Sequence, residues 1–240
     1  MYKLSNKFIE RRFYVCVVGC GGTGGYASES LCRLLPQHAT LILIDHDRVE
    51  ERNLVRQNFI SSELGGFKSE VLAKRLSQRF DRGVGFSTLP VSMVSLPTPG
   101  LIIGCVDNGI ARRDIAKQVS LSFTTNSYTY PSWWVDAGNG DNYGQVIIGN
   151  GNTVAFDERD PECCYELPLP SIKRPDLLKQ APQPQSCAEN DEQNPTINLV
   201  MAALLVDVVR RILEGTCSWS QVYLDLELGA LTPVDIPLPK

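Results

Sequence analysis

The chain has 240 residues, of which 43% are hydrophobic, and its 23 basic and 27 acidic residues give a net charge of −4. This length suits a single α/β domain, and the hydrophobic content can supply a substantial core. The slightly negative charge argues against a nucleic-acid partner, and the longest apolar run, Leu199–Val206, is far too short to cross a membrane.

The first predicted strand runs from Tyr14 to Val18 and leads into a glycine-rich turn. Its β-branched residues are typical of a strand buried on both faces of a parallel sheet. Gly19, Gly21 and Gly24 then supply the pattern G-x-G-x-x-G, and Gly22 lies within it. Such a turn lets the backbone approach a phosphate, and the next helix, predicted near Gly24–Leu35, offers unpaired N–H groups to an anion. Alone, the pattern is a weak indication.

A second predicted strand, Thr40–Ile44, ends in Asp45. A doubly wound fold places a carboxylate that binds ribose hydroxyls about 20 residues beyond the glycine turn. The alternative for Asp45 is a helix cap or a solvated turn. We interpret Asp47, two positions later, as structural.

Polar residues close behind Asp45 indicate a phosphate site. They are Asn53, Arg56, Gln57 and Lys68. A bidentate guanidinium and a flexible ammonium can neutralise a triphosphate, which favours nucleotidyl transfer over hydride transfer. The alternative is that Arg56 and Lys68 are solvated surface charges, as most such residues are. We adopt that interpretation for three residues further along the predicted helix Lys68–Phe80, namely Lys74, Arg75 and Arg79.

The remaining pattern predicts an α/β fold, a Rossmann-like doubly wound, mainly parallel sheet extended by antiparallel strands. Further parallel strands are predicted at Gly85–Leu89, Leu101–Cys105 and Ser132–Asp136, with a helix at Ile110–Leu121. A hairpin is predicted from Gly144–Gly149 and Thr153–Asp157 around the turn Asn150–Asn152, and a late strand at Val222–Leu226. A last helix is predicted to begin at Asn194 or Pro195 and to stop at Gly215.

Asp107 follows the predicted strand Leu101–Cys105. Magnesium takes oxygen ligands, and one aspartate together with substrate phosphates can hold it. The alternative is that Asp107 caps the helix that begins near Ala111, because aspartate and asparagine are preferred at that position.

The eight cysteines divide by spacing and surroundings. Cys163 adjoins Cys164, and Cys217 stands alone, so paired zinc ligands are missing and a structural zinc is not expected. Apolar surroundings predict buried thiols at Cys16, Cys20, Cys32 and Cys105. The polar start of the chain has no signal sequence, which favours a reducing, cytoplasmic location.

Cys187 lies in the string QSCAEN, after a proline-rich stretch from Asp160 to Gln185 without clear periodicity. Long structureless loops are usually functional or disordered, and such a loop could carry a thiol to a reaction centre. The alternative is an incidental exposed thiol, because cysteine reactivity depends on a local pKa. Cys163 and Cys164 are weaker candidates for the same role.

Four strings, GCGGTGG, LILIDHDRVEERNLVRQNF, FKSEVLAKRL and IIGCVDN, resemble the ThiF/MoeB/HesA family, which adenylates the C-terminal carboxylate of ubiquitin-like proteins. The short form with its late SCAEN segment is most similar to the ThiF-like proteins of PRTRC plasmid cassettes. The resemblance extends from Val15 to about Gly215. It implies one ThiF-type adenylation domain over residues 1–240, with a mobile crossover loop at residues 158–194.

The resemblance also implies roles for individual residues. Asp45 would bind ribose, the turn Gly19–Gly24 would lie beside the phosphates, and Asp107 would hold Mg²⁺ with ATP. Arg56 and Lys68 would stabilise charge at the α-phosphorus. The residues that would hold the phosphates are Asn53, Arg56, Gln57 and Lys68, and Cys187 matches the transfer cysteine of thiol-using members.

The implied partner is a small ubiquitin-like protein with a C-terminal glycine, which the antiparallel strands could dock, and the implied assembly is a homodimer. Thioester or sulfur transfer through Cys187 could follow adenylation. The family's R-Y-x-R-Q string, which supplies an arginine to the neighbouring subunit, is missing here; Arg11 or Arg12 could replace it, or both could be exposed charges. Two other functions stay open: a NAD-dependent oxidoreductase, and a catalytically silent interaction module, since fold alone does not establish activity.

Overall fold

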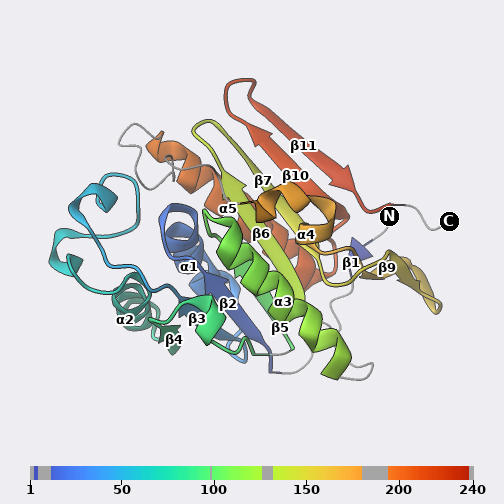
Figure 1. Ribbon diagram of the computed structural model, residues 1–240, viewed down its shortest axis with the longest axis horizontal. Coiled ribbons are helices and arrows are strands. Elements are labelled where there is room, and N and C mark those ends of the chain that lie inside the picture. Colours follow the sequence, from blue (N-terminus) through green and yellow to red (C-terminus); the bar gives the residue numbers. More distant parts are fainter. Residues whose placement is uncertain (1–2, 5–11, 98, 126–131, 180–193, 238–240) are drawn as a thin grey trace.

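A computed structural model describes residues 3–4, 12–97, 99–125, 132–179 and 194–237. An eight-stranded sheet forms its centre, with the strand order β11-β10-β7-β6-β5-β2-β3-β4 (Figure 1). The five parallel strands are β2 (Tyr14–Val18), β3 (Thr40–Ile44), β4 (Val84–Ser87), β5 (Gly100–Gly104) and β6 (Trp133–Asn139). The antiparallel extension consists of β7 (Tyr143–Gly149), β10 (Trp219–Asp225) and β11 (Ala230–Asp235). The predicted Rossmann-like α/β class is confirmed.

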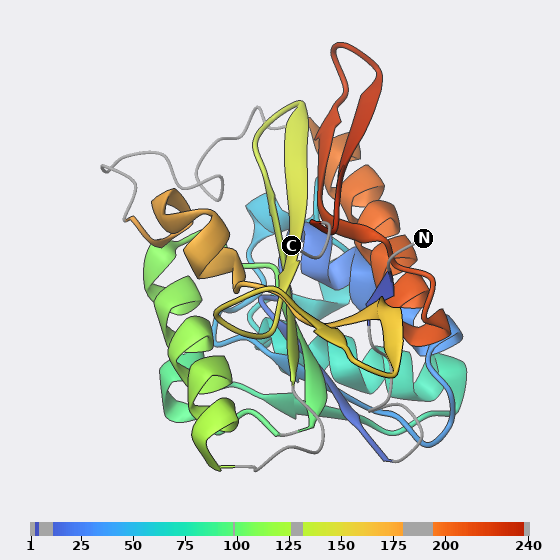
Figure 2. The same ribbon diagram turned by 90° about the vertical axis from the view of Figure 1, so that its right-hand side faces the viewer.

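Helices cover both faces of the sheet (Figure 2). One side carries α1 (Gly22–Leu34), α2 (Lys68–Phe80) and α5 (Pro195–Glu214), and the other carries α3 (Gly109–Thr125) and the short α4 (Pro170–Lys173). Short 3₁₀ turns are η2 (Glu51–Asn53), η3 (Ser61–Glu63), η4 (Val91–Met93) and η5 (Pro175–Leu178). Alternate residues of β2 enter different cores: Val15 and Val17 pack toward α1 and α5, whereas Cys16 and Val18 pack toward α3. This double burial explains the unbroken apolar run.

Strand β2 lies at the point where the chain reverses direction across the sheet. From β2 the chain proceeds outward to β3 and β4, then returns to β5 on the other side of β2 and continues to β6. In an open parallel sheet, this reversal leaves a crevice at the carboxyl ends of the two central strands. The glycine turn follows β2 directly, so it lies in that crevice.

The bounds predicted for the last helix, a start at Asn194 or Pro195 and a stop at Gly215, are confirmed by α5. The Asn194 side chain accepts a hydrogen bond from the Thr196 N–H (3.0 Å), Pro195 is the first helical residue, and Gly215 ends the helix with φ of +67°. These signals are local in sequence, which is why they could be recognised without the fold. None of the described helices is long and apolar enough to cross a membrane.

The predicted hairpin of Gly144–Gly149 with Thr153–Asp157 is wrong. β7 pairs with β6 and β10, whereas β8 (Ala155–Asp157) pairs with β9 (Asp160–Glu166) in a separate small sheet. The Asn150 side chain causes the change of direction, because it donates to the Tyr165 carbonyl (2.7 Å) and accepts from the Leu167 N–H (2.8 Å). These bonds hold the chain away from β7.

The sequence predicted no regular structure for Asp160–Gln185, and this prediction is wrong for residues 160–178. This stretch contains β9, α4 and η5, and β9 pairs in parallel with β1 (Lys3–Leu4). Residues 180–193, which include Cys187, lie outside the described residues, and the mobility of residues 158–194 stays a prediction. Strand β11 was not predicted at all.

Arg82 forms hydrogen bonds to the segment that connects α1 to β3. Its guanidinium is buried and donates to three carbonyls, those of Leu35 (2.6 Å), Pro36 (2.7 Å) and Ala39 (2.7 Å). Because Arg82→Ala would leave these acceptors without a donor, we expect the free energy of unfolding to fall by about 2–3 kcal/mol. Urea denaturation measures this loss.

Arg79→Ala is the matched control for Arg82. The Arg79 side chain is 55% exposed and forms a surface ion pair with Glu29, so its loss should change the free energy of unfolding by less than about 1 kcal/mol. Equal effects of the two substitutions would contradict the role assigned to Arg82.

Candidate nucleotide site

A cavity of about 680 Å³ opens at the carboxyl ends of β2, β3, β5 and β6. Its size lies within the range of small-molecule sites. Eight residues predicted for the site line it, namely Gly19, Gly21, Gly22, Asp45, Arg56, Gln57, Lys68 and Asp107. Two others, Gly24 and Asn53, do not, and Cys187 lies outside the described residues. Because β3 and β6 lie on opposite sides of β2, we call the two halves of the cavity its β3 side and its β6 side.

Three glycines of the turn, Gly19, Gly22 and Gly24, have no space for a side chain. Gly19 has φ of +91°, and a Cβ there would lie 2.4 Å from the Cys105 carbonyl oxygen. A Cβ at Gly24 would lie 1.9 Å from the Gly19 carbonyl oxygen, so Gly24 allows close packing of the turn against α1 and not contact with the cavity. At Gly22 a Cβ would collide with the Asn198 side chain of α5 at 2.4 Å. Backbone therefore forms this wall of the cavity.

Asp45 connects β3 to the glycine turn. Its Oδ2 accepts a hydrogen bond from the Cys20 N–H (2.6 Å), and its Oδ1 accepts from the Asp47 N–H (2.8 Å). Burial raises the pKa of this carboxyl, while Lys68 and the two N–H groups oppose the rise. Each carboxylate oxygen has a second lone pair, so Asp45 can still accept hydrogen bonds from ligand hydroxyls in the cavity.

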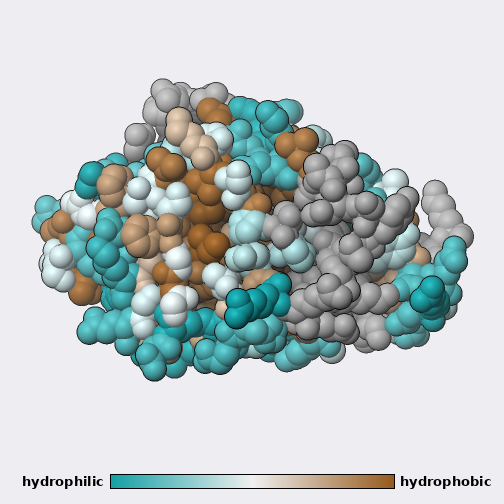
Figure 3. Space-filling model, turned by 90° about the horizontal axis from the view of Figure 1, so that it is seen from below, coloured by the Kyte–Doolittle hydropathy of each residue, from teal (hydrophilic) through white to brown (hydrophobic). Residues whose placement is uncertain are grey.

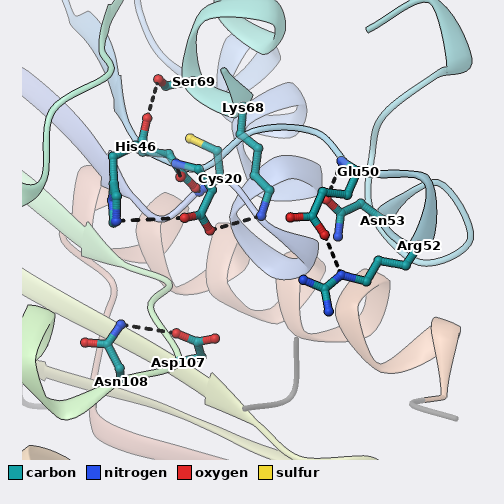
Figure 4. Close-up of polar contacts among 11 residues, drawn as sticks. Cys20, His46, Glu50, Arg52, Asn53, Lys68, Ser69, Asp107 and Asn108 are labelled. Carbon is teal, nitrogen blue, oxygen red and sulfur yellow. Dashed lines mark hydrogen bonds and ion pairs between the residues drawn. The ribbon is translucent and has the colours of Figure 1, made fainter. Parts of the chain in front are cut away.

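Lys68, the first residue of α2, points toward the end of β3 (Figure 4). Its side chain is only 9% exposed, and Nζ lies 3.2 Å from Asp47 Oδ2. Asp47 also lines the cavity, where it is the partner of this buried cation. Its position in the sequence had indicated only a structural role. Among the described residues, Asp45, His46 and Asp47 are the group of three potential metal ligands whose atoms lie within 4.8 Å of one another. The Lys68 ammonium already pairs with Asp47, so a second cation at this group would be repelled.

Arg56 and Gln57 border the glycine turn on the side of α1. Arg56 is buried, and its carbonyl accepts a hydrogen bond from Asn198 Nδ2 (3.3 Å). Gln57 Nε2 lies 3.8 Å from the position of a Cβ at Gly21, and Gln57 Oε1 is buried without a hydrogen-bond partner among the residues that the structure describes. An unsatisfied buried acceptor is costly, which makes Gln57 a candidate for contact with a ligand.

Asn53 shapes the segment that carries Arg56 and Gln57. Its Oδ1 accepts from the Glu50 N–H (2.9 Å), and its carbonyl accepts from the N–H of Gln57 (2.9 Å). Figure 4 shows Asn53 beside Glu50 and away from Asp107. The geometry thus gives Asn53 a structural role in holding η2, at a position where contact with phosphate was predicted.

Asp107 lies across the cavity from Lys68, in the loop before α3 (Figure 4). It is exposed, and its Oδ1 accepts from Asn108 Nδ2 (3.2 Å). The N–H of Ala111 donates to Asn108 Oδ1 (2.8 Å), so Asn108 caps the first turn of α3. The cap considered for Asp107 is therefore supplied by its neighbour, and the Asp107 carboxylate remains accessible to a cation.

Apolar residues form the outer wall on the β3 side. Leu89, Pro90 and Val91 line the cavity between β4 and η4. Seen from below, apolar surface gathers on the half of the molecule that contains β3 and β4 (Figure 3). The exposed large apolar residues of this region include Phe86, Leu89 and Met93. This wall offers an uncharged, apolar surface on the same side of the cavity as Asp45, against which a nucleobase could pack.

A polar network that sequence reasoning missed closes the floor of the cavity. Thr23 donates to Asn139 Oδ1 (3.0 Å), and Asn139 Nδ2 lies 3.4 Å from Asn198 Oδ1. The network joins α1, β6 and α5, and through Asn198 it reaches the Arg56 carbonyl. Its members are far apart in sequence, so no local motif could have identified them.

A buried ion pair on the β6 side was also missed. Arg112 of α3 lines the cavity, and its Nε lies 3.1 Å from Asp136 Oδ2 of β6. Asp136 is fully buried, and burial raises the pKa of its carboxyl while Arg112 opposes the rise. Arg112 follows Asp107 by five residues, and this proximity was the only available signal.

The two cysteines considered as alternatives to Cys187, Cys163 and Cys164, have no accessible thiol. Cys163 and Cys164 are buried, and burial raises the pKa of Cys164 to about 11. The Cys164 thiol would therefore be protonated near neutral pH, which disfavours it as a nucleophile. Cys16, Cys20 and Cys32 are buried as predicted, and burial raises the pKa of Cys16 to about 12. Cys105, also predicted to be buried, is partly exposed because it lines the cavity. Arg12 was a candidate for the arginine that reaches a neighbouring subunit. It is exposed near the amino end of β2, the end of this strand opposite the cavity of its own chain.

Comparisons with known proteins bear on the fold and the family. A model of the ThiF family matches residues 9–228. Ubiquitin-like modifier-activating enzyme 5 of Drosophila grimshawi is 32% identical over 120 residues, which cover 42% of this chain and 29% of that protein. This chain therefore spans less than a third of that relative.

Solved structures share the fold at low sequence identity. MccB of E. coli with ATP aligns with a TM-score of 0.67 at 17% identity, over 97% of this chain and 66% of the MccB chain. MccB with AMPCPP and selenomethionine MccA gives 0.66 at 18% identity, over 98% and 66% of the two chains. PaaA gives 0.63 at 17% identity, over 97% and 75%. Because the family model covers most of its length, the chain belongs to the ThiF family.

Proposed function

We propose that this chain is an ATP-dependent adenylyltransferase that activates the C-terminal carboxylate of a small ubiquitin-like protein ending in glycine. One observation carries the proposal: buried Arg56 and Lys68 and the accessible carboxylate of Asp107 line the same cavity as the glycine turn. Two cations and a metal-binding carboxylate around a backbone wall suit the charge distribution of a nucleoside triphosphate.

The chemistry requires positioning and charge stabilisation, without a general base. A carboxylate is already ionised at neutral pH, so one of its oxygens can attack the α-phosphorus directly. A new oxygen–phosphorus bond forms, the bond to the bridging oxygen breaks, and pyrophosphate leaves with the electron pair. Arg56 and Lys68 would stabilise the charge on the phosphates. Asp107 would hold Mg²⁺ together with ATP oxygens, and the ion would neutralise further phosphate charge.

The relatives support this proposal in general terms. MccB has been solved with ATP and with MccA, and the Drosophila relative is named a ubiquitin-like modifier-activating enzyme. We also propose a relation to the PRTRC branch, on the basis of the late SCAEN segment. We also propose a single adenylation domain over residues 1–240, a homodimer, and docking of the partner on the antiparallel strands β7, β10 and β11. A NAD-dependent oxidoreductase would use Asp45 and the glycine turn but would leave buried Arg56 and Lys68 without a function.

Lys68 provides a test of triphosphate binding. Lys68→Gln removes a buried ammonium beside the glycine turn, so we expect the affinity for ATP to fall by about tenfold, or about 1.4 kcal/mol. The affinity for adenosine should change little, because adenosine has no phosphate. Isothermal titration calorimetry measures both, and a wild-type preference for NAD over ATP would favour the oxidoreductase.

Lys74→Gln is the matched control on the same helix. The Lys74 side chain is 67% exposed and pairs with Glu70 at 2.7 Å, so its loss should leave ATP affinity unchanged. Equal losses of ATP and adenosine affinity in Lys68→Gln would indicate a structural effect and contradict the phosphate role.

Asp107 provides a test of catalysis. Asp107→Asn removes the negative charge that would bind Mg²⁺, and we expect exchange of pyrophosphate into ATP to fall by a factor on the order of 100. The assay contains Mg²⁺ and a ubiquitin-like protein ending in glycine that stimulates exchange by the wild-type chain. Asp81→Asn, at an exposed αL position at the end of α2, should retain exchange. Unchanged exchange in Asp107→Asn would reject the assignment.

Cys187 provides a test of the second step. We propose that its thiolate attacks the carbonyl carbon of the acyl-adenylate, so that a thioester forms and AMP leaves. Wild-type protein should then accumulate a conjugate with the partner that a thiol reagent cleaves, and Cys187→Ser should lose it. Mass spectrometry detects the conjugate, and Cys163→Ala, which alters a buried cysteine, should keep it. A thiol-sensitive conjugate in Cys187→Ser would move this role to another residue.

A further inference from the structure

The Arg112 guanidinium has hydrogen-bonding capacity that the described protein groups do not use. The residue is 7% exposed and lines the cavity. Its Nε is shared between the two oxygens of Asp136, at 3.2 and 3.1 Å. Among the described residues, neither of its two Nη nitrogens has a hydrogen-bond partner. Buried charged donors are normally satisfied, so this geometry points to a ligand.

A second donor converges on the same place. A Cβ built at Gly138 would lie 3.1 Å from Arg112 Nη2 and 3.2 Å from Gln145 Nε2. Gln145 belongs to β7, lines the cavity, and has no side-chain hydrogen bond to any described residue. The donors come from α3 and β7 and approach the same point beside Gly138, which has no side chain to occupy it.

The charge of this place suits a single carboxylate better than a triphosphate. Arg112 is already paired with the buried Asp136, so the pair adds little net positive charge and would repel a second dense anion as much as attract it. A carboxylate oxygen can accept two hydrogen bonds, so a guanidinium and an amide can both donate to one oxygen and leave the other available. Hydrogen-bond geometry, and not net charge, would therefore select the ligand.

The position also suits the acyl donor. Gly138 precedes Asn139, which accepts a hydrogen bond from Thr23 at the start of α1 (3.0 Å). A carboxylate between Arg112 and Gln145 would thus lie on the β6 side of the glycine turn, while Asp45 and Lys68 occupy the β3 side. The two reactants would approach each other across the turn.

We infer that Arg112 and Gln145 form a carboxylate site that holds the C-terminal carboxylate of the acyl donor for attack on the α-phosphorus. The inference rests on the proposed adenylation and names the residues that bind its second substrate. One carboxylate oxygen receives hydrogen bonds from Arg112 and Gln145. The other forms the bond to phosphorus as pyrophosphate leaves, so no additional reactant is needed.

The test uses acetyl-glycyl-glycine and its C-terminal carboxamide as probes, with the full chain and the α,β-methylene analogue of ATP, which cannot form an adenylate. Binding is followed through the Trp134 indole N–H signal in NMR. Trp134 Nε1 and Asp136 Oδ1 both lie 2.9 Å from the position of a Cβ at Gly104, so this indole reports on the ion pair. We expect the acid to bind at least tenfold more tightly than the carboxamide.

Two variants separate binding from folding. Gln145→Leu removes one donor and leaves the ion pair intact, and the double variant Arg112→Gln with Asp136→Asn removes the guanidinium without leaving a buried charge unpaired. Both should reduce acid affinity to the level of the carboxamide and retain affinity for the ATP analogue. Lys117→Gln removes an exposed positive charge from α3 outside the cavity and should bind the acid like the wild type.

Three outcomes would overturn the inference: equal binding of acid and carboxamide, wild-type acid affinity in both variants, or a loss of nucleotide affinity in the double variant as large as that in Lys68→Gln. The last outcome would assign Arg112 to the phosphates. Failure of the wild type to bind the nucleotide would instead reject the proposed adenylation, and an Arg112-dependent preference for the acid would then still support the carboxylate site.

Discussion

The rest of the site depends on close backbone packing at the glycine turn after β2, where Gly19 and Gly24 leave no space for a Cβ atom. A Cβ at Gly24 would lie 1.9 Å from the Gly19 carbonyl oxygen, and one at Gly19 would lie 2.4 Å from the Cys105 carbonyl oxygen. The backbone of β2, the end of β5 and the start of α1 therefore approach one another directly. This contact brings Asp45, Arg56 and Asp107 to one cavity, although Asp107 follows β5 whereas Asp45 and Arg56 lie between β3 and β4.

Buried charge gives this cavity its chemical character. Lys68 has a half-exposed partner in Asp47, and Arg112 has a fully buried partner in Asp136. The first arrangement leaves an ammonium that a polyphosphate can attract, whereas the second provides oriented donors with little net charge. The two sides of the cavity thus suit different anions. This division agrees with a reaction that joins a carboxylate to a phosphorus atom.

Most of the α/β core could be predicted because its signals are local. The apolar run of β2, the spacing of the glycines and the caps of α5 each depend on a few consecutive residues. The hairpin prediction failed at Asn150, where side-chain bonds to Tyr165 and Leu167 redirect the chain. Of the predicted site residues, Lys68 and Asp107 line the cavity, whereas Asn53 lies outside its lining and accepts a hydrogen bond from the Glu50 N–H at the start of η2.

The amino-acid sequence by itself determined the strand-and-helix alternation, the glycine turn and the identity of the cations near it, because each follows from residue type and short-range spacing. Only the tertiary structure decided which polar groups meet. Arg112 pairs with Asp136 across 24 residues, and Asn198 reaches the Arg56 carbonyl across 142 residues. Such contacts depend on strand order and helix packing, which bring distant segments to the same edge of the sheet and leave no pattern in the local sequence.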